Sequence, residues 1–192
     1  MINRIFFILI LNVISILSYA QHTVTIYFTK TWKVTHNRKE AEFYRVINFD
    51  SANKPAGLVR DYFMNGKLQY EAAKIYADTI DPRQDTTDGF ARWYSKKGQL
   101  IQESFFAHGK LQGERKHWYD TGELKSISHY NGGLLDGEYV SYYQDGNYNY
   151  KINYSHGAIV GKKGTYYNSY SSRCDYFYDE FHLPKDPYDW KL

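Results

Sequence analysis

The chain has 192 residues, which is enough for a single domain once a leader is set aside. Its formal charge of +3, from 24 basic and 21 acidic residues, gives no electrostatic case for a nucleic-acid partner. The only cysteine, Cys174, excludes an intramolecular disulfide. Twenty-one Tyr, eleven Phe and four Trp suit the pleated, half-buried surface of a sheet, so the composition predicts a mostly β fold.

Residues 1–20 have the pattern of a secretory signal peptide. A basic start is followed by an apolar stretch from Ile5 to Leu17 and then by Ser18-Tyr19-Ala20 before Gln21. The apolar stretch falls short of the roughly 20 residues that a membrane-spanning helix needs. We therefore expect an exported protein, periplasmic or at the cell surface, with no integral membrane span after cleavage. The alternative is an uncleaved N-terminal anchor.

Residues 21–56 form an N-terminal cap or a degenerate repeat. The segment Thr23 to Thr35 alternates polar and apolar side chains, and Glu42 to Phe49 is a second strand candidate. Ser51 to Ala56, which contains a proline, is predicted to turn into the first clear repeat.

Three glycine series with one period mark tandem repeats over residues 57–170. Their members step by 24 residues: Gly89, Gly113, Gly137 and Gly161; Gly109, Gly133 and Gly157; Gly98, Gly122 and Gly146. Each unit is predicted to be a strand, a turn at the third series, a second strand, and a longer Gly-x-x-x-Gly turn. The fold class is therefore all-β, an elongated antiparallel meander sheet of tandem β-hairpin repeats of about 24 residues.

Two segments depart from the regular period. An inserted loop over 78–88 widens one step, and 171–192 is predicted to be a C-terminal cap and tail that closes the sheet edge.

An aromatic pair precedes each glycine of the third series. Because side chains alternate along a strand, the two members of a pair are predicted to point to opposite faces. One predicted face carries the candidate partner-binding residues Tyr62, Trp93, Trp118, Tyr142 and Tyr166. We expect such a face, where it is exposed, to serve as a platform for a protein, a lipid headgroup or a glycan, because Tyr and Trp combine a large apolar surface with a polar tip.

The core motif Tyr-x-x-Gly-x-x-x-Gly, followed by Tyr-Tyr-x-x-Gly, resembles the MORN-repeat variant of bacterial proteins, often described as YwqK-family antitoxin-like. The resemblance covers about residues 57–170, as an exported member of that family. It implies a sheet of successive hairpins and a role in binding rather than catalysis. A second segment, Trp93 to Leu100, is similar to the cell-wall-binding hairpin repeats of surface proteins.

No motif for catalysis, phosphate binding or metal binding stands out, so we expect neither an enzyme nor a cofactor. His117 and His129 lie on one predicted hairpin but lack further ligands. The aspartates of the inserted loop are interpreted as a solvated acidic loop rather than a calcium site: Asp78, Asp81, Asp85 and Asp88.

The leading functional hypothesis is a protein-binding or scaffolding module of the cell envelope, whose partner is a protein or an envelope component. Two alternatives stay open. One is a glycan-binding or cell-wall-binding module that uses exposed Trp and Tyr, and the other is an antitoxin-like component of a toxin–antitoxin pair.

Overall fold

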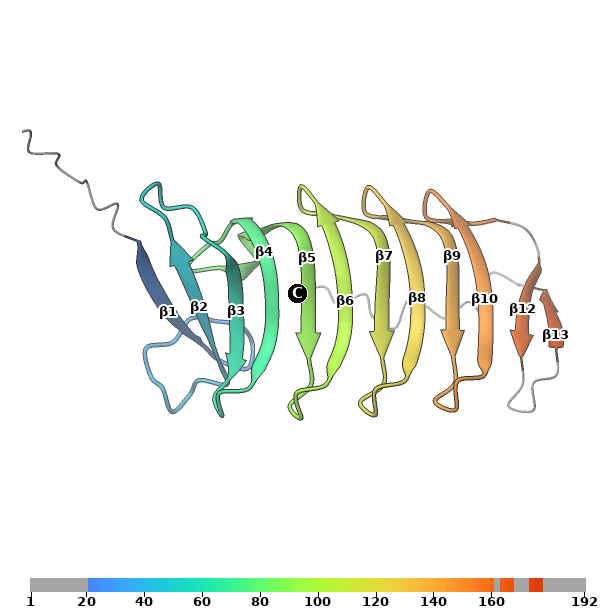
Figure 1. Ribbon diagram of the computed structural model, residues 1–192, viewed down its shortest axis with the longest axis horizontal. Coiled ribbons are helices and arrows are strands. Elements are labelled where there is room, and N and C mark those ends of the chain that lie inside the picture. Colours follow the sequence, from blue (N-terminus) through green and yellow to red (C-terminus); the bar gives the residue numbers. More distant parts are fainter. Residues whose placement is uncertain (1–20, 161–162, 168–172, 178–192) are drawn as a thin grey trace, which may run out of the picture.

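The described residues of the computed structural model, 21–160, 163–167 and 173–177, form one thirteen-stranded antiparallel sheet (Figure 1). The strands follow one another in chain order from β1 to β10 and then to β12 and β13, while β11 pairs with β10. The predicted all-β meander is therefore confirmed. The predicted signal peptide, residues 1–20, lies outside the described residues, as does the predicted C-terminal cap apart from 173–177.

The strand bounds are β1 His22–Phe28, β2 Phe43–Phe49, β3 Leu58–Phe63, β4 Leu68–Tyr76, β5 Thr86–Tyr94, β6 Leu100–Ala107, β7 Lys110–Trp118, β8 Leu124–Asn131, β9 Leu134–Tyr142, β10 Tyr148–Ser155, β11 Ala158–Ile159, β12 Lys163–Tyr167 and β13 Arg173–Phe177. A single 3₁₀ turn, η1 Pro82–Gln84, lies in the inserted loop. Within the described ranges, no helix has the length and apolar character needed to cross a membrane.

The 24-residue period is visible in the strand starts, because β7, β9 and β11 begin 24 residues apart. One kind of turn joins the two strands of each hairpin. At β5–β6 the N–H of Ser95 donates to the carbonyl of Gln99 at 2.8 Å, and the N–H of Gly98 donates to the carbonyl of Ser95 at 2.8 Å. Gly98 has a φ of 94°, the left-handed conformation that this turn position requires.

The second kind of turn differs from the prediction of a longer Gly-x-x-x-Gly turn. Only two residues, His108 and Gly109, connect β6 to β7, and both have positive φ, as a type I′ hairpin demands. The second glycine of the motif lies inside the next strand, at a bulge. At Gly137, φ is 112° and an added Cβ would approach His129 Cβ to 3.1 Å. The Gly133–Gly137 copy of the motif therefore combines a tight turn with a close strand contact, whereas at Gly113 no atom lies within 4 Å of an added Cβ.

The register defines an inner and an outer face of the sheet. Directly opposed residues share a face, and one such row defines the inner face. This inner row consists of Arg45, Asp61, Tyr70, Trp93, Gln102, His117, Ser126, Ser141 and Tyr150.

Trp93 and Trp118 lie on opposite faces, so the prediction that they share one face is wrong. Trp118 is opposite Leu124, whereas its neighbour His117 is in the inner row with Trp93. The reason is a one-residue offset, because Trp93 follows Gly89 by four positions and Trp118 follows Gly113 by five. A one-residue shift moves a side chain to the other face of a strand.

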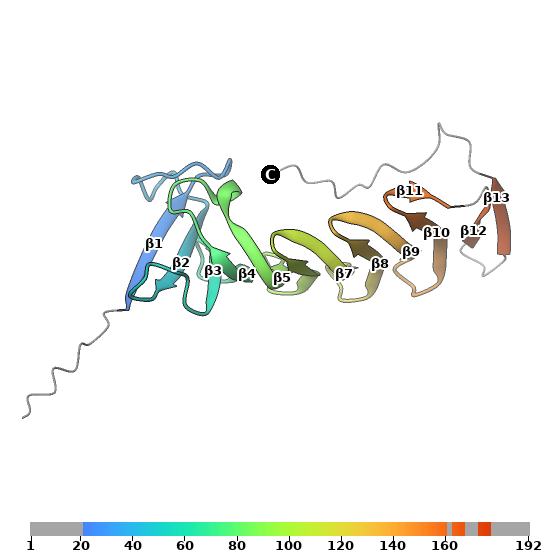
Figure 2. The same ribbon diagram turned by 90° about the horizontal axis from the view of Figure 1, so that it is seen from above.

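The inner face is packed most fully at its N-terminal end. Phe28, Ile47 and Val59 are almost completely buried there, and the segments after β1 and around η1 both lie on this side of the sheet (Figure 2). Farther along the array the buried inner positions carry small side chains such as Ser104 and Ser126. Among the described residues, loops therefore cover one end of the sheet and the rest of it is a single layer.

Candidate functional site

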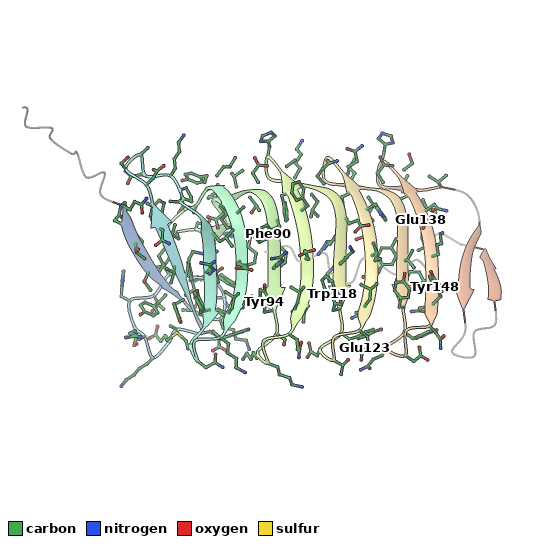
Figure 3. All side chains as sticks on the ribbon, in the orientation of Figure 1. Phe90, Tyr94, Trp118, Glu123, Glu138 and Tyr148 are labelled. Carbon is green, nitrogen blue, oxygen red and sulfur yellow. The ribbon has the colours of Figure 1, made fainter. Side chains whose placement is uncertain are left out.

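An aromatic row crosses the outer face next to the hairpin turns that contain glycine. This outer aromatic row consists of Tyr27, Tyr44, Tyr62, Tyr94, Trp118, Tyr142 and Tyr148. Tyr44 stacks on Tyr62 with ring centroids 5.0 Å apart, and Tyr142 lies at the same distance from Tyr148. Figure 3 shows Tyr94, Trp118 and Tyr148 at one level across three successive hairpins.

A row of alternating charges runs beside the outer aromatic row. Arg60, Glu71, Arg92 and Glu103 oppose one another in turn across β3 to β6. Glu71 Oε2 lies 3.3 Å from Arg60 Nε, and Glu71 Oε1 lies 3.9 Å from Arg92 Nη1. Arg92 Nε donates to Glu103 Oε2 at 2.6 Å. The Tyr94 hydroxyl also donates to Glu71, at 3.0 Å. Partly exposed pairs of this kind contribute about 0–1 kcal/mol each, so they shape the surface more than they stabilise the fold.

The predicted partner-binding residues divide between the two faces. Tyr62, Trp118 and Tyr142 belong to the outer aromatic row, whereas Trp93 is on the inner face. The backbone of Tyr166 is opposite Tyr150, in line with the inner row, and its side chain lies outside the described residues.

Four members of the outer aromatic row were absent from the predicted binding residues: Tyr27, Tyr44, Tyr94 and Tyr148. Tyr94 follows Gly89 by five positions, as Trp118 follows Gly113. Counting from the first-series glycine of each repeat therefore identifies Tyr94, and not Trp93, as the equivalent of Trp118.

A pocket of about 580 Å³ opens on the inner face at the N-terminal end of the sheet. The turn after β1, the loop around η1 and the inner sides of β2 to β5 form it. Trp32, Tyr70 and Trp93 supply aromatic walls, and Ile80, which is 77% exposed, stands in the loop around η1. The volume is typical of small-molecule sites, which span about 300–1,000 Å³.

Four buried charges form the polar floor of this pocket. Arg45 binds Asp61 through two hydrogen bonds of 2.6 and 2.8 Å and reaches Asp85 at 2.7 Å. Lys74 Nζ donates to the same oxygen of Asp85 at 2.8 Å. Two cations and two carboxylates leave the floor electrically balanced, as buried charges require.

Burial and the neighbouring charges shift the pKa values of the two cations in the floor. Burial lowers the pKa of Lys74, and the nearby Asp85 carboxylate offsets part of this effect. Burial alone would lower the pKa of Arg45 too, but its bonds to Asp61 and Asp85 raise that pKa overall. Both cations therefore depend on their carboxylate partners.

Trp32 has a backbone conformation that is unusual for a tryptophan. The N–H of Thr29 donates to Lys33 O at 2.9 Å and the N–H of Trp32 donates to Thr29 O at 3.0 Å, which is the turn pattern of the repeats. Trp32 thus takes the position that Gly98 holds in its own turn, with a φ of 58°. Its indole stacks on Phe43 with centroids 4.8 Å apart and planes within 5°.

The inserted loop contains more than solvated carboxylates, contrary to the sequence interpretation. The Asp85 side chain is only 3% exposed and joins the pocket floor. Asp81 accepts from the backbone and side chain of Arg83, and Asp78 accepts from two N–H groups of its own loop. In the part of the chain that the structure describes, no group of three His, Cys, Asp or Glu side chains is placed to hold a metal ion.

Comparison with known proteins identifies two of the repeats. Residues 111–131 and 135–156 match the family model described as MORN repeat variant. These stretches correspond to β7–β8 and to β9–β10 with the turn that follows. The resemblance to this repeat family is confirmed over that region. No curated protein matches the chain.

Proposed function

We propose that this chain is an exported, non-enzymatic repeat module that holds a protein partner in the cell envelope on its outer aromatic row. The observation that supports this proposal is a row of Tyr and Trp on successive hairpins, interleaved with Leu and beside alternating Arg and Glu, on the outer face of the sheet. Repeat arrays present extended surfaces of this kind, because each unit contacts only its neighbours.

The composition of the outer face favours a protein as the ligand. Tyr, Trp and Arg are the residues that most often dominate binding energy at protein interfaces. Tyr and Trp are stiff, so ordering them on binding costs little conformational entropy. From β1 to β10 there are nine strand spacings of about 4.8 Å, so the row is roughly 40 Å long, enough for a standard interface.

The two alternative functions differ in what they require of this face. A glycan module stacking sugars on Trp93 and Trp118 together needs both on one side, and these residues lie on opposite faces. An antitoxin-like role is also a protein-binding role, and the identity of the partner separates it from envelope scaffolding.

A comparison of two surface variants tests the proposal. The chain without its predicted leader, residues 21–192, is immobilised and exposed to an envelope extract, and the bound proteins are quantified by mass spectrometry. Three proteins are compared: wild type, the outer variant Tyr94→Ala/Trp118→Ala, and the inner control Trp93→Phe. We expect a discrete protein that wild type and Trp93→Phe retain and the outer variant loses. Equal retention by the outer variant, with unchanged thermal unfolding, contradicts the proposal.

A further inference from the structure

The inner pocket has two surfaces of different chemistry. Trp32, Tyr70 and Trp93 give it broad apolar walls, and the buried network of Arg45 and Asp85 gives it a polar floor. A ligand that fits such a pocket needs an apolar face and a polar edge.

Two polar groups of the lining have unused hydrogen-bonding capacity. Gln69 Oε1 is buried and accepts no hydrogen bond from any described residue. Lys74 has three N–H donors; Asp85 accepts from one of them, and the ammonium also lies 5.2 Å from the centroid of the Tyr70 ring. An unpaired buried acceptor costs about as much as a lost hydrogen bond, so a ligand that donates to Gln69 is favoured.

The balance of charge in the floor determines the kind of ligand. The carboxylates of Asp61 and Asp85 neutralise Arg45 and Lys74 in the floor, and Asp81 pairs with Arg83 beside it, so the exposed Lys33 alone adds an excess charge to the lining and none lies in the buried floor. A hydroxyl is neutral, donates to an amide oxygen such as that of Gln69, and accepts from an ammonium such as that of Lys74. An aliphatic or Phe side chain of a peptide offers only an apolar surface to both groups, and a Trp indole can donate but cannot accept.

The conformation of Trp32 indicates that its indole has a role that a glycine could not fill. A φ of 58° strains the backbone of a bulky residue, and the equivalent turns of the repeats have glycine at this position. The indole lines the pocket and is held flat by its stacking on Phe43. Strain of this kind is concentrated at functional sites.

We propose that the inner pocket binds one neutral sugar residue, with its C–H face on Trp32 and Trp93 and its hydroxyls on Lys74 and Gln69. A pyranose ring combines an apolar C–H face with a neutral edge of hydroxyl donors and acceptors, which the walls and floor of this pocket match. The site is on the opposite face from the outer aromatic row, so it does not depend on the proposed protein partner.

Saturation-transfer NMR and tryptophan fluorescence on the mature chain test the site. The probes are glucose and N-acetylglucosamine as free sugars, their disaccharides cellobiose and diacetylchitobiose as glycan ends, and N-acetyltryptophanamide as a peptide-like probe. For a ligand with about a dozen non-hydrogen atoms we expect a Kd of about 1 mM. Saturation should be transferred mainly to protons on one face of the sugar ring. Tighter binding of the disaccharides indicates a glycan end as the source, and equal binding indicates a free sugar.

Three variants separate binding from folding. Trp32→Gly restores the usual turn residue but removes the packing of the indole on Phe28 and Phe43, so the chain should stay folded with lower thermal stability while sugar binding weakens about tenfold. Gln69→Leu removes the unpaired acceptor, so we expect unchanged or higher thermal stability and about threefold to tenfold weaker binding. Trp118→Ala, on the outer face, should leave sugar binding unchanged.

Three results would overturn the sugar site. One is the absence of saturable binding by every sugar of the panel. Another is binding that Trp32→Gly leaves intact in a folded chain. The third is binding of N-acetyltryptophanamide in place of the sugars, which would assign the pocket to a peptide side chain.

Discussion

Arg45 and Asp61 face each other across β2 and β3 and are joined by two parallel hydrogen bonds, Nε to Oδ1 at 2.6 Å and Nη2 to Oδ2 at 2.8 Å. Their side chains are 3% and 2% exposed. Both charges are shielded from water, so each depends on the other to compensate the free-energy cost of its desolvation. The pair also anchors Asp85, and through it the inserted loop, to the sheet.

Asp61→Asn should therefore destabilise the fold strongly. The change leaves the Arg45 guanidinium short of one negative charge, and breaking a buried pair from one side costs about 3–5 kcal/mol. Glu103→Gln is the matched control, since its pair with Arg92 is partly exposed and should contribute less than about 1 kcal/mol. Urea unfolding of the three proteins measures the difference. Similar losses for both variants would show that the Asp61 pair is not buried in solution.

This pair illustrates what the sequence alone could not provide. The repeat, the all-β class and the positive φ at Gly98 follow from local patterns, because turn chemistry and strand alternation act over a few residues. Arg45 and Asp61 are sixteen residues apart and belong to no repeated motif. A contact of that kind depends on the register of neighbouring strands and on the loops that cover them.

The error at Trp93 has a more specific cause. The expectation paired adjacent aromatics, and it took Trp93-Tyr94 as equivalent to Trp118-Tyr119. The structure instead fixes the register at the glycine bulges, so the distance from Gly89 decides which face a residue takes. The pocket was not predicted either, because Trp32 reaches it from a turn where the repeats have glycine.

Acid should destabilise the protein through His117. Burial, together with the positive charges of Arg115 and Lys125, lowers the pKa of His117 to about 3 in the folded chain. In the unfolded chain its pKa is near 6.5, so between that pH and about pH 3 His117 is protonated in the unfolded state and neutral in the folded state. The stability that depends on a neutral His117 is therefore fully present above about pH 6.5 and is lost progressively as the pH falls toward about 3.

Urea unfolding at pH 7 and pH 5 measures this contribution. From the two pKa values we expect His117 to account for a loss of about 2 kcal/mol over that interval. His117→Gln should remove this part of the loss, while the exposed control His36→Gln should keep it. A pH dependence that is the same in all three proteins would refute the assignment to His117.

Two glycines of the repeat should differ in their tolerance of alanine. At Gly98 no atom lies within 4 Å of an added Cβ, so Gly98→Ala carries only the cost of a left-handed φ, about 1–2 kcal/mol. At Gly137 the same cost is joined by the 3.1 Å approach to His129 Cβ, and overpacking adds about 1–3 kcal/mol. In thermal unfolding, the Tm of Gly137→Ala should be well below that of Gly98→Ala. The reverse order would mean that the bulge contact is not tight.

Removal of one whole repeat should leave a folded, shorter sheet. Deletion of 110–133 joins Gly109 to Leu134 and so keeps a two-residue turn, because Lys110 and Leu134 are equivalent strand starts. The array loses two strands, which shortens it by about 10 Å, and loses about one repeat's share of stability. Small-angle scattering and urea unfolding measure both quantities.

A deletion of 110–132 is the control for this experiment. It retains Gly133 as an extra turn residue, and a one-residue slip sends the side chains of the following strands to the wrong face. We expect that variant to lose cooperative unfolding of its C-terminal half, whereas the 24-residue deletion keeps a single transition. If both deletions behave alike, the register is set by something other than the 24-residue unit, and the assignment of residues to the inner and outer faces would have to be revised.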